Sequence, residues 1–225
     1  MYAGQTDDMT TLTCRAIVFD MDGTLVDSTA VVERIWGDFA AEHELDVVEL
    51  IAFAHGRQTH DTVTRFLPQL SEVEARALTD GLQAVEAGTR DGSVEIPGAA
   101  AFVAGLPSDR VALVTSANHE LARARMAEAG VALPAVVLAS EQVAVGKPAP
   151  DGYLMAAELL GVDPGDVVVF EDAAAGLEAA RASGASVVVV GDHDGPAADG
   201  LPRIAGYHGV TVEVRDDGSL VATLP

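Results

Sequence analysis

Basic residues are scarce in this chain. Its 225 residues include 35 Asp and Glu but only 13 Lys and Arg, which gives a formal net charge of -22. A protein that binds nucleic acid uses Lys and Arg to replace the counterions of the phosphate backbone. Because this chain would repel that backbone, we expect no nucleic-acid partner.

Cysteine and long apolar runs are also nearly absent. A single cysteine, Cys14, excludes an internal disulfide, and residues 1–10 lack the basic region and apolar stretch of a signal peptide. The longest apolar runs, such as VVVV at residues 187–190, are far too short to span a bilayer. We therefore expect a cytoplasmic protein with no membrane partner.

Many of the apolar residues gather in five short runs rich in Val and Ile. Such a run, bounded by polar or turn residues, is typical of a strand buried on both faces, as in a parallel sheet. The runs are RAIVFDMDG (15–23), VALVTSAN (111–118), AVVLASE (135–141), DVVVFEDAA (166–174) and SVVVVGD (186–192). Helical patterns between them end at Gly130, Gly161 and Gly184. This alternation predicts an α/β fold with a Rossmann-like parallel-sheet core.

The segment after the first run breaks this alternation. Residues 29–92 contain helical patterns but no apolar strand, and a helical repeat of apolar residues begins at Val32. Ser71 and Glu74 have the spacing of a capping box, which predicts a second helix through about Val85. Because the segment is too long for a loop between a strand and a helix, we predict an inserted all-helical cap domain.

These patterns divide the chain into two predicted domains. The cap comprises residues 29–92, and the catalytic core comprises residues 1–28 and 93–225. Near the end of the chain, GVTVEVRDDGSLVATL (209–224) has two alternating runs around a DDG turn, which predicts a hairpin at an edge of the sheet. The segment ADGLPRIAG (198–206) is interpreted as a loop.

Polar residues stand where the predicted strands end. They are Asp20, Asp22, Thr115, Ser116, Glu171 and Asp172. Ligands of an open parallel sheet bind beyond the carboxyl ends of its strands, so these residues form one candidate site. Four crowded carboxylates raise one another's pKa unless a cation is bound. Oxygen ligands of this kind indicate a hard divalent metal, and we predict Mg²⁺.

A bound Mg²⁺ leaves coordination positions for phosphate oxygens, so we expect the site to bind a phosphoryl group. Thr115 stands just before a predicted helix, whose N-terminus favours an anion. Lys147 is the single lysine of the chain and lies in GKPAPD, where the prolines stiffen the segment around its charge. Each residue alone has a structural explanation as a turn, helix cap or surface group. Their occurrence together favours the phosphoryl site.

Four segments resemble the sequence motifs of haloacid dehalogenase superfamily phosphatases. They are DMDGTLVDS (20–28), VALVTSAN (111–118), GKPAPD (146–151) and VFEDAAAGLEAARASGA (169–185). The helical insert after the first motif resembles the branch that includes β-phosphoglucomutase and small sugar-phosphate phosphatases. The resemblance implies a catalytic parallel-sheet core, a helical cap that governs substrate choice, and Mg²⁺ as cofactor.

The resemblance also implies a role for each matching residue. Asp20 would be the nucleophile that takes the phosphoryl group as an aspartyl phosphate. Asp22 would be the general acid on the leaving alcohol and then the general base on water. Thr115 and Lys147 would hold the phosphoryl oxygens. The implied metal ligands are the Asp20 carboxylate, the Asp22 backbone carbonyl, Asp172, and Glu171 directly or through water.

The segment AFAHGRQTHDTV (52–63) resembles the cap loop of sugar-phosphate and polyol-phosphate phosphatases. The resemblance implies that Arg57 reaches toward the substrate. Two structural alternatives stay open, in which His55 is a hydrogen-bonded histidine of the core or the cap and Arg57 is a surface ion-pair partner. His60 is interpreted as a surface residue. The predicted substrate-binding residues are His55, Gly56, Arg57, Ser116 and Asn118.

These observations predict a Mg²⁺-dependent phosphatase of small phosphomonoesters, most plausibly of sugar or polyol phosphates. The main alternative is a sugar-phosphate mutase, but β-phosphoglucomutases carry a histidine in the first cap helix where this chain has Val32. A non-catalytic phospho-ligand module with an acidic cluster is a further alternative, against which the helical insert argues. We expect a small phosphorylated metabolite as substrate and a monomer or weak homodimer.

Two other reactions of the superfamily are excluded by residue type. True haloacid dehalogenases resemble this chain but lack the acid at the position of Asp22. The phosphonate hydrolases use a lysine of the cap, whereas the single lysine here, Lys147, belongs to the third motif.

Overall fold

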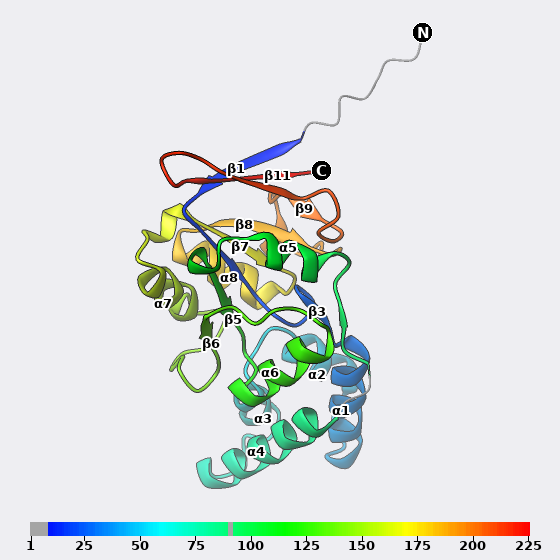
Figure 1. The fold of residues 1–225 in the computed structure, drawn as a ribbon. Helices are drawn as coiled ribbons and strands as arrows, with labels where there is room; N and C mark the ends of the chain where they lie inside the picture. Colours follow the sequence, from blue (N-terminus) through cyan, green and yellow to red (C-terminus); the bar gives the residue numbers. More distant parts are fainter. Residues whose placement is uncertain (1–8, 90–91) are drawn as a thin grey trace.

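Six parallel strands form the central sheet of the computed structural model, which describes residues 9–89 and 92–225 (Figure 1). In spatial order they are β6 (Val136–Leu138), β5 (Val111–Val114), β2 (Ala16–Phe19), β7 (Val167–Glu171), β8 (Ser186–Val190) and β9 (Arg203–Ile204). Every neighbouring pair is parallel. The first five coincide with the five apolar runs, so the predicted parallel-sheet core is confirmed.

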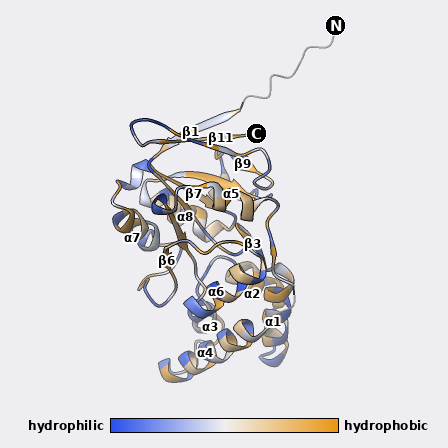
Figure 2. Ribbon diagram, in the orientation of Figure 1, coloured by the Kyte–Doolittle hydropathy of each residue, from blue (hydrophilic) through white to orange (hydrophobic). Residues whose placement is uncertain are grey.

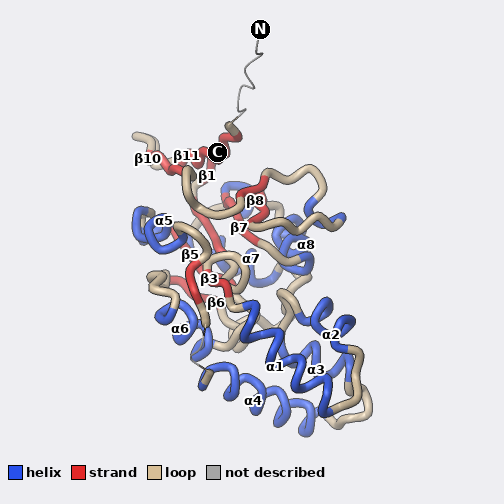
Figure 3. Tube along the Cα trace, turned by 90° about the vertical axis from the view of Figure 1, so that its right-hand side faces the viewer, coloured by secondary structure: helices blue, strands red, loops and turns tan. Residues whose placement is uncertain are grey.

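Apolar side chains on both faces of the sheet explain why the strands are continuous apolar runs. Along β2, Ile17 and Phe19 belong to one buried cluster, whereas Ala16 and Val18 belong to a second. Helices cover both clusters, α5 (Ala99–Gly105) and α6 (His119–Glu128) on one face, α7 (Asp151–Leu160) and α8 (Ala174–Ser183) on the other (Figure 3). Figure 2 shows the hydrophobic colour concentrated in this sheet. The carboxyl ends of β2, β5 and β7 therefore meet at one buried edge.

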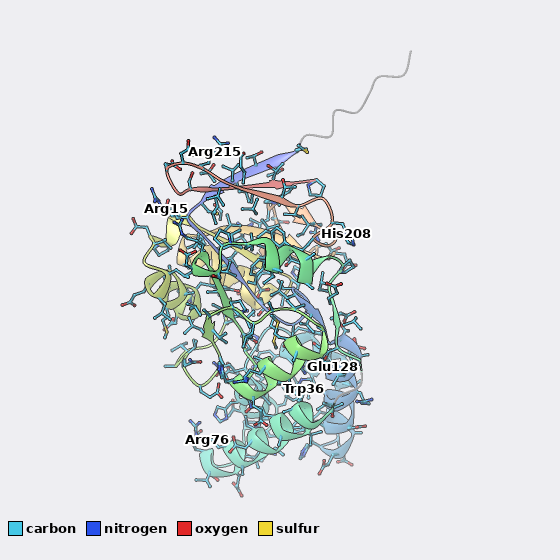
Figure 4. The ribbon with its side chains drawn as sticks, viewed as in Figure 1. Arg15, Trp36, Arg76, Glu128, His208 and Arg215 are labelled. Atoms are coloured by element: carbon cyan, nitrogen blue, oxygen red, sulfur yellow. The ribbon has the colours of Figure 1, made fainter. Side chains whose placement is uncertain are left out.

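The helical insert lies between β3 (Val26–Asp27) and β4 (Val94–Glu95), which pair as a short antiparallel ladder. It consists of α1 (Thr29–Glu42), α2 (Val47–Ala54), α3 (Thr59–Phe66) and α4 (Glu72–Gly88). These helices share a third apolar cluster, which contains Phe39 and Trp36. Figure 4 labels Trp36. That separate core supports the proposed division into a cap of residues 29–92 and a core of residues 1–28 and 93–225.

The capping box that opens α4 is confirmed. The Ser71 side chain accepts from the backbone amide of Glu74, and the Glu74 side chain accepts from the backbone amide of Ser71. The helix continues to Gly88, one turn beyond the predicted end near Val85. This extra turn carries Glu86 to the boundary between the cap and the core.

Two predictions for the C-terminal part are wrong in detail. The hairpin of β10 (Thr211–Val214) and β11 (Leu220–Leu224) forms, but it pairs with β1 (Thr10–Cys14) in a separate three-stranded sheet instead of at an edge of the central one. The segment interpreted as a loop contains β9, whose two residues pair with Val189 and Val190. Two residues are too few to show a strand period in the sequence.

None of the helices in residues 9–89 and 92–225 is long and apolar enough to cross a membrane.

Candidate active site

The loop after β2 carries Asp20 and Asp22 to the edge of the sheet. The Asp20 amide donates to the Phe170 carbonyl at 3.0 Å, so the nucleophile candidate is held directly by the neighbouring strand β7. The loop then turns at Gly23, whose φ is +81°, and a Cβ there would overlap the Asp172 carboxylate. Only glycine therefore allows the loops after β2 and β7 to approach this closely.

Lys147 lies between two carboxylates. Its Nζ is 2.5 Å from Asp20 Oδ1 and 2.6 Å from Glu171 Oε1, and all three side chains are buried. Burial opposes the charge of Lys147, but Asp20 and Glu171 together raise its pKa well above the ordinary value. The geometry therefore fixes one positive charge beside the nucleophile candidate, and the predicted contact of Lys147 with a phosphoryl group stays a prediction.

Glu171 is held by several partners. Besides Lys147, its Oε1 accepts from the Tyr153 hydroxyl at 3.2 Å, and its Oε2 accepts from the Ala173 amide at 2.8 Å. Glu171 is completely buried. These bonds give it a structural task that the sequence did not predict, which is to hold Lys147 against Asp20.

Three carboxylates lie close enough to hold a metal ion. Asp20, Glu171 and Asp172 each offer an oxygen, and these oxygens lie within 4.8 Å of one another. Burial raises the pKa of Asp20 to about 7 although Lys147 opposes the shift, and burial next to Glu171 and Asp20 raises the pKa of Asp172 well above its usual range. A set of carboxylate oxygens whose ionised forms are this unfavourable fits a hard divalent cation.

Asp22 has different partners. Its Oδ1 accepts from the Ser28 hydroxyl at 2.6 Å, and its Oδ2 accepts from Arg125 Nη1 at 2.9 Å. The carboxylate is thus held away from the cluster of Asp20, Glu171 and Asp172, which suits a proton carrier more than a metal ligand.

The residues of the second motif connect the core to the cap. Thr115 is buried, and its Oγ1 accepts from the Ala117 amide at 3.1 Å. Ser116 Oγ donates to the Gly56 carbonyl at 2.8 Å. Asn118 accepts from the Leu121 amide as the N-cap of α6, and its Nδ2 donates to Gln83 Oε1 of α4 at 3.1 Å. Substrate binding by Ser116 and Asn118 stays a prediction.

The cap loop of residues 55–57 faces the carboxylates of the core. His55, Gly56 and Arg57 line a cavity together with Asp20 and Thr115. The Arg57 guanidinium lies 4.5 Å from the centre of the Phe53 ring. No ion pair of Arg57 occurs among the residues that the structure describes, and His55 is exposed, so neither structural alternative for these two residues is met.

His60, interpreted from sequence as a surface residue, is half-buried instead. Its Nδ1 lies 3.3 Å from Thr79 Oγ1, and its Nε2 lies 3.6 Å from Glu72. The residue lies on α3 beside α4, and helix packing in the cap accounts for its position.

The cavity between cap and core has a volume of about 100 Å³. Asp20, Asp22 and Asp172 line it from the core, and Val32 and Trp36 line it from the cap. A second hollow of about 650 Å³ adjoins it and shares Asp172.

The family model for haloacid dehalogenase-like hydrolases matches residues 14–184. The chain belongs to this family. Hexitol phosphatase A of Escherichia coli is 41% identical to this hydrolase over 79% of the chain and 83% of the relative. A β-phosphoglucomutase of Mycobacterium tuberculosis is 29% identical over 92% of the chain and 91% of the relative. The fold of this hydrolase is also that of a β-phosphoglucomutase from Clostridium difficile, with a TM-score of 0.71 at 19% identity over 86% and 91% of the two chains.

Two charged residues of this hydrolase line the cavity without having been predicted from sequence. Arg125 of α6 and Glu86 of α4 are 5% and 7% exposed, and Arg125 Nη2 lies 3.9 Å from Glu86 Oε1. Charged residues in helices are ordinarily solvated, so neither was singled out. Their spacing could have indicated burial, because it places each residue on the buried face of its helix. Arg125 follows the buried Leu121 by four residues, and Glu86 follows the buried Thr79 by seven.

We predict that Glu86→Gln stabilises the hydrolase at neutral pH. Burial raises the pKa of Glu86 from 4.5 to about 7, with Arg125 opposing the shift and Asp22 adding to it. Between these two values the folded state binds more protons than the unfolded state, so the stability of the wild type falls as the pH rises from 4.5 to 7. Glutamine carries no such charge. The gain should approach zero at pH 4.5 and reach on the order of 2 kcal/mol at pH 8.

Urea unfolding at several pH values between 4.5 and 8 would measure this difference. Asp80→Asn, at an exposed position of the same helix, is the matched control and should show no pH-dependent gain. A Glu86→Gln variant whose stability relative to wild type is the same at both ends of the range contradicts the prediction.

Proposed function

We propose that this hydrolase is a Mg²⁺-dependent phosphatase of small phosphomonoesters, chiefly sugar or polyol phosphates. The observation that carries the proposal is the buried Lys147–Asp20 pair at the carboxyl ends of the strands, in which Asp20 lines the cavity together with Asp172. The relative named hexitol phosphatase A supports the same substrate class.

Asp20 acts as the nucleophile. Its carboxylate oxygen forms a bond to phosphorus while the bond from phosphorus to the substrate's ester oxygen breaks, which yields an aspartyl phosphate. The nucleophile must be ionised although burial raises its pKa to about 7. The charge of Lys147 at 2.5 Å favours the ionised form, and Lys147 and Thr115 hold phosphoryl oxygens as their charge develops.

Asp22 moves the protons. It gives a proton to the departing ester oxygen, then takes one from the water that attacks phosphorus, and the bond between phosphorus and Asp20 breaks to release phosphate. The bonds from Ser28 and Arg125 hold both oxygens of Asp22 in one orientation. Such positioning keeps the proton carrier beside the leaving group throughout both steps.

The residues that would hold Mg²⁺ are Asp20, Asp172 and the backbone carbonyl of Asp22, with Glu171 through water because its oxygens already accept from Lys147, Tyr153 and Ala173. When bound, the ion supplies positive charge that neutralises the phosphoryl oxygens. Without it, the carboxylates of the site that are ionised repel a phosphate group.

Hydrolysis is favoured over the mutase reaction by the lining of the cavity. A mutase must protect its aspartyl phosphate from water until a sugar accepts the phosphoryl group. Val32 of α1, at the position of the mutase histidine, lines the cavity with an apolar side chain that can neither donate nor accept a hydrogen bond. Water is therefore the acceptor that the site favours.

A phosphate-release assay over hexose, pentose, polyol and nucleotide monophosphates tests the proposal. With Mg²⁺ we expect turnover of several sugar or polyol phosphates, and EDTA should lower the rate at least about 100-fold because charge compensation is lost. Added Mg²⁺ should restore the rate. Calorimetry should show that EDTA also abolishes binding of inorganic phosphate. No turnover of any phosphomonoester with Mg²⁺ contradicts the proposed activity.

A further inference from the structure

The two terminal nitrogens of the Arg125 guanidinium differ in their hydrogen bonding. Nη1 donates to Asp22, but the buried Nη2 has no hydrogen-bond partner among the described residues. The nearest acidic atom, Glu86 Oε1, is 3.9 Å away, beyond the length of a hydrogen bond. Arg125 is 5% exposed, and a buried donor left unpaired is unfavourable for the folded protein.

A hydroxyl group is able to form a hydrogen bond with each of these two atoms. An alcohol oxygen accepts a hydrogen bond and its proton donates another, whereas Arg125 only donates and an ionised Glu86 only accepts. One oxygen to the side of the line that joins Nη2 and Oε1 can lie at ordinary hydrogen-bond distances of about 2.8 Å from both atoms. A methyl or methylene group in the same place satisfies neither.

The pair also lies next to the residue that protonates the leaving group in the proposed mechanism. Arg125 Nη1 donates to Asp22, and the unpaired Nη2 belongs to the same guanidinium. Trp36 and Leu121 line the same cavity and offer apolar surface to the carbon chain of a ligand. The charged pair and the apolar wall together match an alkyl chain that carries hydroxyls.

Joining the cap to the core explains the Glu86–Arg125 pair less well than hydroxyl binding does. Glu86 and Arg125 join α4 of the cap to α6 of the core, but at 3.9 Å they make a poor ion pair, and well-packed apolar residues would hold the two helices at least as firmly. Both buried residues also line the cavity. Their polarity is therefore directed at what the cavity contains.

From this arrangement we infer that Glu86 and Arg125 form a hydroxyl-binding site, which selects phosphomonoesters of polyols and sugars over those whose leaving group carries no hydroxyl. The inference rests on the proposed phosphatase function and assigns its substrate preference to two named side chains. Glu86 is the specificity-determining residue of the pair, and Arg125 additionally positions Asp22.

The experiment compares kcat/KM for glycerol 1-phosphate and sorbitol 6-phosphate with kcat/KM for n-propyl phosphate, which has the same phosphate ester but no hydroxyl. In wild type we expect both polyol phosphates to be preferred. Glu86→Ala should lower the preference for at least one of them by 10-fold or more, mainly through KM, because the acceptor is lost. Glu86→Gln keeps an acceptor oxygen and should retain part of the preference. Asp80→Asn on the same helix is the control and should keep all of it.

An unchanged preference for both polyol phosphates in a folded Glu86→Ala variant overturns the inference and leaves the phosphatase proposal intact. If Glu86→Ala does not fold, Glu86→Met, which fills the space without a carboxylate oxygen, decides, and a preference within 2-fold of wild type overturns the inference. Failure of wild type to release phosphate from all three esters is a different result, because it refutes the proposed function itself.

Discussion

Asp20→Asn should abolish turnover, with a loss of at least about 10⁴-fold in kcat, while the fold is retained. The amide has the shape of the carboxylate but cannot form the aspartyl phosphate. The variant should also be at least as stable as wild type at pH 8 in EDTA, because the folded protein no longer holds an ionised Asp20 whose pKa burial has raised to about 7. Phosphate release and urea unfolding measure the two effects.

The control for this variant is Asp216→Asn, at an exposed position in the turn between β10 and β11, which should leave both kcat and stability at wild-type values. Residual activity of Asp20→Asn above about 1% of wild type would refute the assignment of the nucleophile. A trapped complex with intact substrate would support it, because the phosphoryl-binding groups Thr115 and Lys147 are unchanged.

The parallel sheet could be predicted because its physics is local. Each strand of the buried sheet must be apolar on both faces, and all five runs form strands made almost entirely of Val, Ile, Leu, Phe and Ala. Strand β1 pairs instead with β11, more than 200 residues later in the chain, and its sequence TTLTC has no continuous apolar run. The separate three-stranded sheet therefore depended on a distant pairing that no local pattern encodes.

The candidate site likewise contains some residues that a local sequence pattern indicates and others that it does not. Asp20, Thr115, Lys147 and Asp172 come from strand ends and a motif, and the structure brings Asp20, Lys147 and Asp172 together. The pairing of Lys147 with Glu171 was not predictable from spacing, because it depends on how the third motif folds over the end of β7. Glu86 and Arg125 were missed because their importance comes from burial across the boundary between cap and core.

Lys147→Met should remove activity and destabilise the fold together. The variant leaves Asp20 and Glu171 buried without their shared cation, and removing one partner of a buried ion pair costs about 3–5 kcal/mol. We expect kcat to fall at least about 10³-fold, because the nucleophile loses the charge that keeps it ionised and the phosphoryl oxygens lose a donor. Phosphate release with Mg²⁺ and urea unfolding in EDTA measure the two losses.

The pH dependence of this destabilisation identifies its cause. Lys147 lowers the pKa of Asp20, so in Lys147→Met that pKa rises further above 7, and the folded variant binds a proton that the unfolded chain has already released. The stability deficit should therefore grow as the pH rises through about 7, so that it is larger at pH 8 than at pH 5. A deficit of the same size at both pH values would indicate lost packing of the lysine stem instead.

A double variant separates charge from packing. If an unpaired buried carboxylate causes the deficit, Glu171→Gln added to Lys147→Met should recover part of the lost stability at pH 8, and the two changes should be strongly non-additive because Lys147 Nζ and Glu171 Oε1 are 2.6 Å apart. Activity should not return, since neither change restores the cation beside Asp20. Additive losses would show that Glu171 does not hold Lys147, and the bonds from Tyr153 and Ala173 would then be its main structural task.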